Sequence, residues 1–195
     1  MKEWVTTTIV LNELSSGKED AWNAFSKDCH PMLVKFGVKL GLSHHNAEDA
    51  AQDTMMTFVR LYREGKYIRG EGGGLRKWFF GIAYNVIRDV RRRLPREMQV
   101  ADETTGTSFF ESVEDKNIEQ TWDDGWQGMI LAKCLDRVRR EYRKDIEIFE
   151  LLAVHGKSVS EVATQFNKTE NAIYSIKHKI LKRIGKLKSD FEKGD

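Results

Sequence analysis

Long apolar runs, prolines and cysteines are scarce in this chain of 195 residues. The longest apolar-leaning stretch, residues 78–87, is much shorter than the roughly 20 residues that a membrane-spanning helix needs, and the N-terminus lacks the pattern of a secretion signal. Two prolines are too few for a turn-rich β-sandwich, and two cysteines outside any Cys-x-x-Cys spacing exclude a disulfide framework and a zinc ribbon. We therefore expect an all-α, cytoplasmic protein with no membrane span.

An excess of charge of one sign is also missing, because the formal net charge is only +2. Residues 69–96 hold 8 basic and 2 acidic side chains, residues 97–132 hold 1 and 9, and residues 133–195 hold 15 and 10. The near-neutral total is therefore a cancellation between basic and acidic segments. We predict two small helical domains, over 1–94 and 129–195, joined by an acidic flexible linker over 95–128, where no steady apolar period is visible.

Amphipathic helices account for the first domain. Between Trp22 and Leu40, apolar residues recur every three or four positions, which predicts a helix that Pro31 kinks or divides. A second helix near residues 47–63 buries one apolar face and leaves an acidic face outward. That face is either solvated, with its acids complementing the helix dipole, or a docking surface for a basic partner. Its outward groups include Glu48, Asp49, Gln52 and Asp53.

A third helix, over residues 75–93, combines a broad apolar face with a face of cations and aromatic rings. Guanidinium groups bind phosphates, rings stack on unpaired bases, and an amide can contact a base edge, so this face suits nucleic acid. A merely solvated basic face is the alternative. The outward side chains are Arg76, Lys77, Phe80, Tyr84, Asn85, Arg88, Arg91 and Arg92.

The C-terminal domain has the pattern of a helix-turn-helix. Ser158 and Glu161 form a capping box, Asn167 occupies a turn position that needs a left-handed conformation, and Thr169 caps the helix that begins at Glu170. A plain pair of packed helices is the alternative. The outward side chains of the last helix are suited to base edges and phosphates in a major groove: Asn171, Tyr174, Ser175, Lys177, His178, Lys179, Lys182 and Arg183.

Taken in this order, the segments resemble the sigma-70 family of RNA polymerase sigma factors, specifically the extracytoplasmic-function (ECF) group. Residues 46–54 look like region 2.2, residues 75–93 look like regions 2.3 and 2.4, and residues 159–187 look like region 4.2. The resemblance implies that Asp49, Gln52 and Asp53 bind the β′ clamp helices of core polymerase. It also implies minus-35 recognition by the outward side chains of the last helix. The implied minus-10 contacts are Arg76, Lys77, Trp78, Tyr84, Asn85, Arg88 and Arg92.

The function implied by the resemblance is promoter-specific initiation of transcription, with no catalytic residue, metal or cofactor of its own. The implied partners are core RNA polymerase (the β′ clamp helices and the β flap), promoter DNA and an anti-sigma factor. The sequence departs from the family at Leu75, where an aromatic is common, and at Asn167, where Gly is usual. Three glycines, Gly72 to Gly74, alter the loop that would hold an extruded base, so Tyr67 and Arg69 are only weak candidates for that pocket.

Two other functions remain open from the residues. One is a stand-alone helix-turn-helix regulator, which would explain the last domain but would leave the acidic face and the Arg/aromatic helix without a role. The other is a metal-dependent nucleic-acid enzyme with ligands drawn from Cys29, His30, His44, His45 and Asp49 or Asp53. We favour a structural Cys29 over a ligand, because it lies within an apolar stripe.

Overall fold

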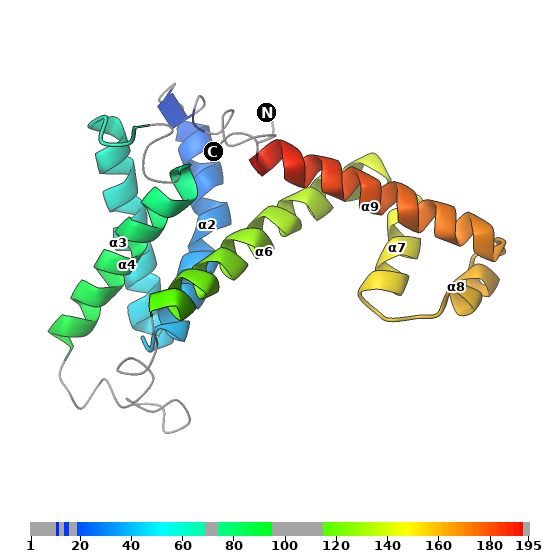
Figure 1. Ribbon diagram of the computed structural model, residues 1–195, viewed down its shortest axis with the longest axis horizontal. Coiled ribbons are helices and arrows are strands. Elements are labelled where there is room, and N and C mark those ends of the chain that lie inside the picture. Colours follow the sequence, from blue (N-terminus) through cyan, green and yellow to red (C-terminus); the bar gives the residue numbers. More distant parts are fainter. Residues whose placement is uncertain (1–10, 12–13, 16–18, 69–73, 95–114, 193–195) are drawn as a thin grey trace. The chain divides into compact units, whose positions relative to one another are not determined.

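The computed structural model describes residues 11, 14–15, 19–68, 74–94 and 115–192. All regular elements in these residues are helices, which confirms the expected all-α class (Figure 1). No described helix combines the length and the apolar character needed to cross a bilayer. The elements are α2 (Glu19–Lys39), α3 (His44–Arg63), α4 (Gly74–Arg93), α6 (Asp115–Glu141), α7 (Ile146–Ala153), α8 (Val159–Gln165) and α9 (Glu170–Glu192).

The chain divides into two compact units, with the boundary between Met129 and Ile130 inside α6. Unit 1 contains α2, α3, α4 and the first half of α6. Unit 2 contains the second half of α6 together with α7, α8 and α9.

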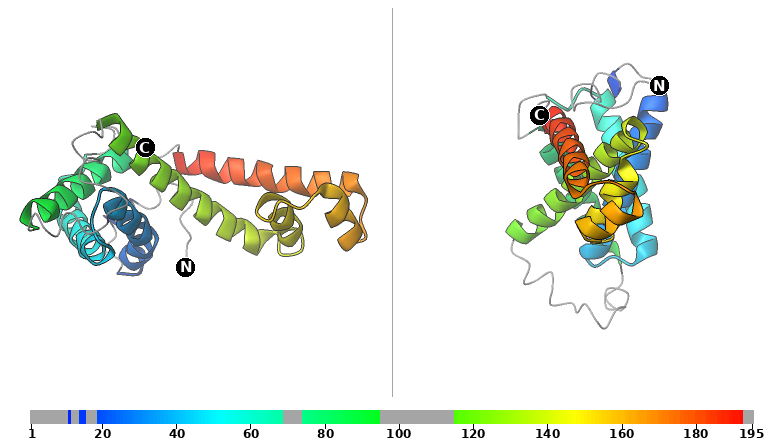
Figure 2. Two further views of the ribbon diagram at one scale, coloured as in Figure 1. Left: turned by 90° about the horizontal axis from the view of Figure 1, so that it is seen from below. Right: turned by 90° about the vertical axis from the view of Figure 1, so that its right-hand side faces the viewer.

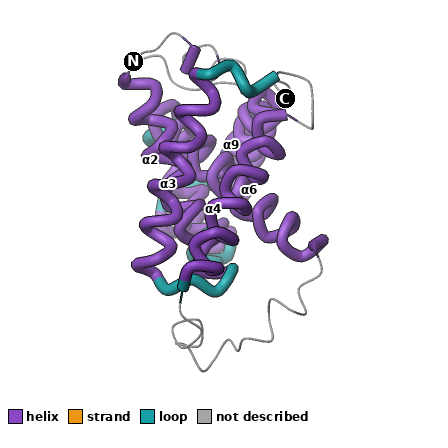
Figure 3. The backbone as a smooth tube through the Cα atoms, turned by 90° about the vertical axis from the view of Figure 1, so that its left-hand side faces the viewer, coloured by secondary structure: helices purple, strands orange, loops and turns teal. Residues whose placement is uncertain are grey.

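Helices α2, α3 and α4 lie beside one another in unit 1, as Figure 3 shows. Helix α2 continues through Pro31, so this proline does not divide the helix. Helix α3 begins where the side chain of Ser43 accepts a hydrogen bond from the backbone N–H of Asn46, at 3.2 Å. This cap satisfies one of the N–H groups that the first turn of a helix leaves without a partner.

An aromatic cluster centred on the buried Phe58 of α3 holds these helices together. The ring centroid of Phe58 lies 4.9 Å from that of Phe25 in α2 and 4.8 Å from that of Phe79 in α4. Trp22 and Trp78 extend the cluster, at 6.0 and 5.2 Å from Phe58. Such pairs contribute about 0.5–1.5 kcal/mol beyond simple burial, so the cluster ties α4 to the other two helices.

Residues 115–128 are helical, which corrects our prediction that the whole of 95–128 is a flexible linker. Trp122 is only 2% exposed, and its ring lies 5.2 Å from Phe36 and 5.5 Å from Phe79. Gly125 allows the close approach of Met32, whose Cγ would lie 3.2 Å from an added Cβ. The rest of the predicted linker, 95–114, lies outside the described residues.

The signal for this helix was present in the sequence. Ile118, Trp122, Trp126 and Ile130 recur every fourth residue, and all four side chains are buried. The many acids between them suggested a solvated linker. Their carboxylates project from the other faces of the helix, however, so the acidic composition and a buried apolar stripe are compatible.

Unit 2 contains the helix-turn-helix geometry that the sequence predicts. The side chain of Ser158 accepts from the N–H of Glu161, whose carboxylate accepts in return from the N–H of Ser158 at 2.8 Å. Asn167 adopts a φ of 50°, as the turn requires. Helices α7 and α8 lie on the same side of α9 (Figure 2). The buried core of this unit includes Ile148, Val162, Ala163 and Ile173.

The packing of Trp122 leads to a stability prediction. We expect Trp122→Ala to lower the free energy of unfolding of unit 1 by about 3–5 kcal/mol, because a large buried side chain is replaced by a cavity. All five tryptophans of the chain lie before residue 130, so the fluorescence of the other four during urea unfolding reports on unit 1. The control is Glu119→Ala, at an exposed position of the same helix. An equally small effect of both variants would mean that this segment does not stabilise unit 1.

Candidate nucleic-acid interface

The three side chains expected to bind core polymerase lie on one exposed face of α3. Asp49, Gln52 and Asp53 are three and four residues apart, so they are neighbours on the helix surface. All three side chains are exposed. The imidazole Nε2 of His45 lies 3.7 Å from a carboxylate oxygen of Asp49. The face is therefore acidic at its N-terminal end.

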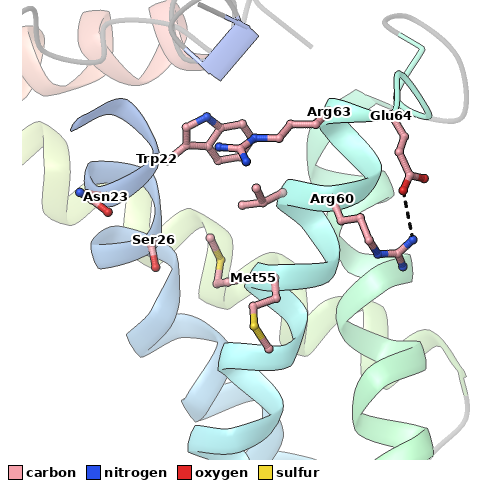
Figure 4. A pocket seen from close by; sticks show the side chains of 9 residues that line it. Trp22, Asn23, Ser26, Met55, Arg60, Arg63 and Glu64 are labelled. Carbon is pink, nitrogen blue, oxygen red and sulfur yellow. Dashed lines mark hydrogen bonds and ion pairs between the residues drawn. The ribbon is translucent and has the colours of Figure 1, made fainter. Parts of the chain in front are cut away.

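A groove of about 590 Å³ continues this face toward the C-terminal end of α3 (Figure 4). Met56 follows Gln52 and Asp53 by four and three residues and is 64% exposed. At the far end, the guanidinium of Arg63 lies 5.6 Å from the ring centroid of Trp22. The sequence does not predict this groove, although Met56 is an outward apolar residue in a polar row. It is lined by Trp22, Asn23, Ser26, Met55, Met56, Val59, Arg60, Arg63 and Glu64.

Helix α4 presents a row of cations with an amide among them. Lys77, Asn85, Arg88 and Arg92 are exposed, and their spacings of eight, three and four residues place them along one side of the helix. Tyr84 is half-buried at the edge of this row, with its ring stacked on Phe80 at 5.8 Å. The structure therefore brings together five of the seven side chains expected to contact the minus-10 element.

The other two, Arg76 and Trp78, are half-buried against neighbouring side chains. Arg76 forms an ion pair with Asp123 of α6, at 3.1 Å. Trp78 is half-buried, with its ring 5.2 Å from Phe58 and 5.1 Å from Tyr67. Its packing fixes α4 to α3. Arg69, a weak candidate for the base pocket, lies outside the described residues.

The helix-turn-helix presents a second row along α9. Asn171, Tyr174, Ser175, His178 and Lys182 are all exposed. Successive spacings of three, one, three and four residues place them on one side of the helix. The hydroxyl of Ser175 donates to the backbone carbonyl of Asn171 at 2.9 Å.

Two of the cations expected to contact the minus-35 element are instead held by carboxylates of unit 2. Arg183 makes two hydrogen bonds to Glu141, at 2.7 and 2.8 Å. Lys179 forms an ion pair with Asp145 and lies 5.0 Å from the ring centroid of Tyr142. The two pairs fix α9 against the last residue of α6 and against the segment that follows it.

The carboxylate of Glu141 is stabilised in its charged form. Hydrogen bonds from Arg183, and from Arg137 at 2.9 Å, lower the pKa of Glu141 from 4.5 to about 2. Burial opposes this effect only in part.

Lys177, the remaining cation expected at the minus-35 element, is half-buried beside the row on α9.

The residues considered for a metal site do not assemble into one. Cys29 is buried, with its Sγ 3.7 Å from the Sδ of Met129. His30 instead faces Glu48, with 3.3 Å between Nε2 and a carboxylate oxygen. Within the described ranges, no group of three or more His, Cys, Asp or Glu side chains has an arrangement that could hold a metal ion.

The pKa of Glu141 predicts a pH-dependent stability of unit 2. Because this pKa is lower in the folded chain, the ion pair stabilises the fold above pH 4.5 and the contribution is lost as the pH falls toward 2. We expect Glu141→Gln to cost about 1 kcal/mol at neutral pH, a modest value because the pair reaches solvent. Urea unfolding followed by circular dichroism from pH 7 to pH 3 should show the difference shrinking. Glu147→Gln, at an exposed site of α7, is the control, and a difference independent of pH would contradict the assignment.

Comparison with known proteins identifies two relatives. No family model and no solved structure matches the chain. The ECF RNA polymerase sigma factor BldN of Streptomyces coelicolor is 27% identical over 145 residues, which are 74% of this chain and 51% of that protein. The ECF RNA polymerase sigma factor SigE of Mycolicibacterium smegmatis is 26% identical over 145 residues, or 73% and 51% of the two chains.

The chain thus spans about half the length of the curated relatives it matches. The two matches agree with the resemblance carried by residues 46–54, 75–93 and 159–187. They support the assignment of this chain to the ECF group of the sigma-70 family.

Proposed function

We propose that this chain is a sigma factor that binds core RNA polymerase, directs it to specific promoters and helps to open the DNA. The observation that carries the proposal is the exposed row on α4, where Lys77, Arg88 and Arg92 flank Asn85, with Tyr84 at the edge. Such a row binds phosphates through its cations and single-stranded bases through its ring and amide. The two ECF sigma factors to which the chain is similar support the same function.

Core polymerase is the proposed partner of the outward face of α3. Asp49, Gln52 and Asp53 would bind basic side chains of the β′ clamp helices. The adjoining groove, with Met56 exposed beside it, would accept an apolar side chain of the same partner. The acidic groups favour rapid encounter with a basic surface, and the buried apolar contact slows dissociation. Unit 2 would bind the β flap.

Promoter opening requires no hydrolysis in this proposal. Separating the strands costs base stacking, and bases that leave the duplex recover part of this cost by packing on protein, at roughly 1–3 kcal/mol per stacked base. Tyr84 offers a ring for such packing, and Asn85 offers an amide that can discriminate between bases. Lys77, Arg88 and Arg92 would hold the phosphates on either side.

The division of the chain into two units supports the need for a scaffold. Each unit carries its own row of proposed DNA contacts, on α4 in unit 1 and on α9 in unit 2. Promoter recognition needs a defined separation between two DNA elements. Core polymerase, bound to both units, would set that separation.

The proposal is tested by adding the purified chain to bacterial core polymerase and measuring transcription from a library of promoter fragments. We expect specific initiation that depends on the chain, and we expect Asp53→Arg to reduce it at least about tenfold, because a like charge would face a basic partner. Glu119→Arg, an equal change of charge at an exposed site of α6, is the control. Tight binding of closed duplex by the free chain, with no binding to core, would identify a stand-alone regulator instead.

A second variant tests the row on α4. We expect Asn85→Ala to reduce the preference for the best minus-10 sequence over single-base variants by roughly tenfold, because the amide would contact one base edge. Open-complex formation on matched promoters measures this ratio. Asn117→Ala removes an exposed amide of α6 and should leave the ratio unchanged. An equal loss on all promoters would show that Asn85 does not discriminate between bases.

A further inference from the structure

The exposed row of α9 is almost neutral. Among the described residues, the side chains of Asn171, Tyr174, His178 and Lys182 make no hydrogen bond or ion pair within the protein. Lys182 is the one permanently charged group among them. The row therefore presents an amide, a phenol and an imidazole to a partner, followed by a single ammonium group.

Two cations beside this row are held by carboxylates of the same unit. Arg183 is bound by Glu141 through two hydrogen bonds, and Lys179 is paired with Asp145. Moving Lys179 to a DNA phosphate would break its ion pair with Asp145, and moving Arg183 would leave Glu141 with Arg137 alone. Within the exposed row, phosphate attraction therefore rests on Lys182.

Guanine has no suitable partner at the start of α9. The commonest contact to guanine comes from Arg or Lys, which bind its O6 and N7 together. Residues 170–181 contain no arginine, and their two lysines are the half-buried Lys177 and the ion-paired Lys179. The N-terminal residues of a recognition helix are those that contact base edges. The start of α9 is therefore poorly suited to select guanine.

Adenine and thymine do have suitable partners there. An Asn amide matches the N6 donor and N7 acceptor of adenine, and an apolar surface matches the methyl group of thymine. Asn171 lies in the first turn of α9, after the Thr169 hydroxyl that accepts from the N–H of Ala172 at 3.2 Å. Tyr174 is one turn later and 54% exposed. The two positions are separated by a rise of about 4.5 Å along the helix, so both side chains lie near its N-terminal end, where a recognition helix contacts base edges.

We infer that α9 selects an adenine through Asn171 and a neighbouring thymine through Tyr174, with Lys182 binding a phosphate farther along. This inference rests on the proposed function, since it requires that α9 enters the major groove of promoter DNA. The inferred DNA ligand is an upstream promoter element that contains two neighbouring A·T pairs. We do not expect an element whose guanines are recognised by arginine side chains.

The test uses the full chain bound to core polymerase. A pool of duplexes with a randomised block at the upstream element is selected for binding to this complex. The selected duplex is then synthesised again with one of two nucleotide analogues, each of which removes one recognition group from a base. Replacing one thymidine by 2′-deoxyuridine removes the methyl group, and replacing one deoxyadenosine by its 7-deaza analogue removes the N7 acceptor. We expect losses of affinity of about threefold to fivefold and about tenfold, respectively, by fluorescence anisotropy.

Four variants test the roles of these side chains. Asn171→Ala should become insensitive to 7-deaza-deoxyadenosine, and Tyr174→Ala should become insensitive to deoxyuridine. Tyr174→Phe is the matched control, because it keeps the ring and should keep the sensitivity to deoxyuridine. Lys182→Ala should weaken all duplexes equally and lower the slope of log affinity against log salt by about one.

Two results would overturn the inference and leave the proposed function intact. One is selection of an upstream element without an A·T pair. The other is a wild-type complex that is unaffected by either replacement at every adenine and thymine of the block. If the chain with core selects no sequence at all, the proposed function fails, and the inference about Asn171 and Tyr174 fails with it.

Discussion

The packing of α4 is the constraint on which the rest of unit 1 depends. Its apolar face is held by Phe58 on one side and by Trp122 on the other, with ring centroids of both residues within 5.5 Å of Phe79. A helix anchored along one face cannot rotate without breaking these contacts. The opposite side, with Lys77, Asn85, Arg88 and Arg92, is therefore fixed toward solvent. The proposed minus-10 surface is a consequence of this aromatic core.

Unit 2 uses charge for the same purpose. Glu141 and Asp145 hold Arg183 and Lys179, so two cations of α9 stabilise its position instead of remaining available to a partner. The row that remains exposed on α9 is largely neutral, so a partner would be bound there mainly through hydrogen bonds and apolar contacts. The two units thus offer different chemistry to a nucleic acid. The row on α4 is strongly cationic, whereas the row on α9 has one permanent charge.

Most of the fold could be predicted from the sequence because its signals are local. The helical periods, the Ser158 capping box and the left-handed Asn167 each depend on a few neighbouring residues, and all are present in the structure. The helix over residues 115–128 differs from the prediction because its acidic composition favours a linker, whereas its buried residues recur only at every fourth position. Trp122 and Trp126 were visible four residues apart, but their partners Phe36 and Phe79 lie more than 40 residues away in the chain.

The sequence by itself determined the helical class, the helix-turn-helix and the side chains that can face outward, because each follows from the geometry of a single helix. Only the tertiary structure decided which of those side chains are available. Arg76, Lys179 and Arg183 look equivalent to their neighbours on a helical projection, yet each is paired with a carboxylate from another segment. The groove beside Met56 likewise requires two helices. Ion pairs and grooves are made by residues distant in the chain, and no local pattern encodes them.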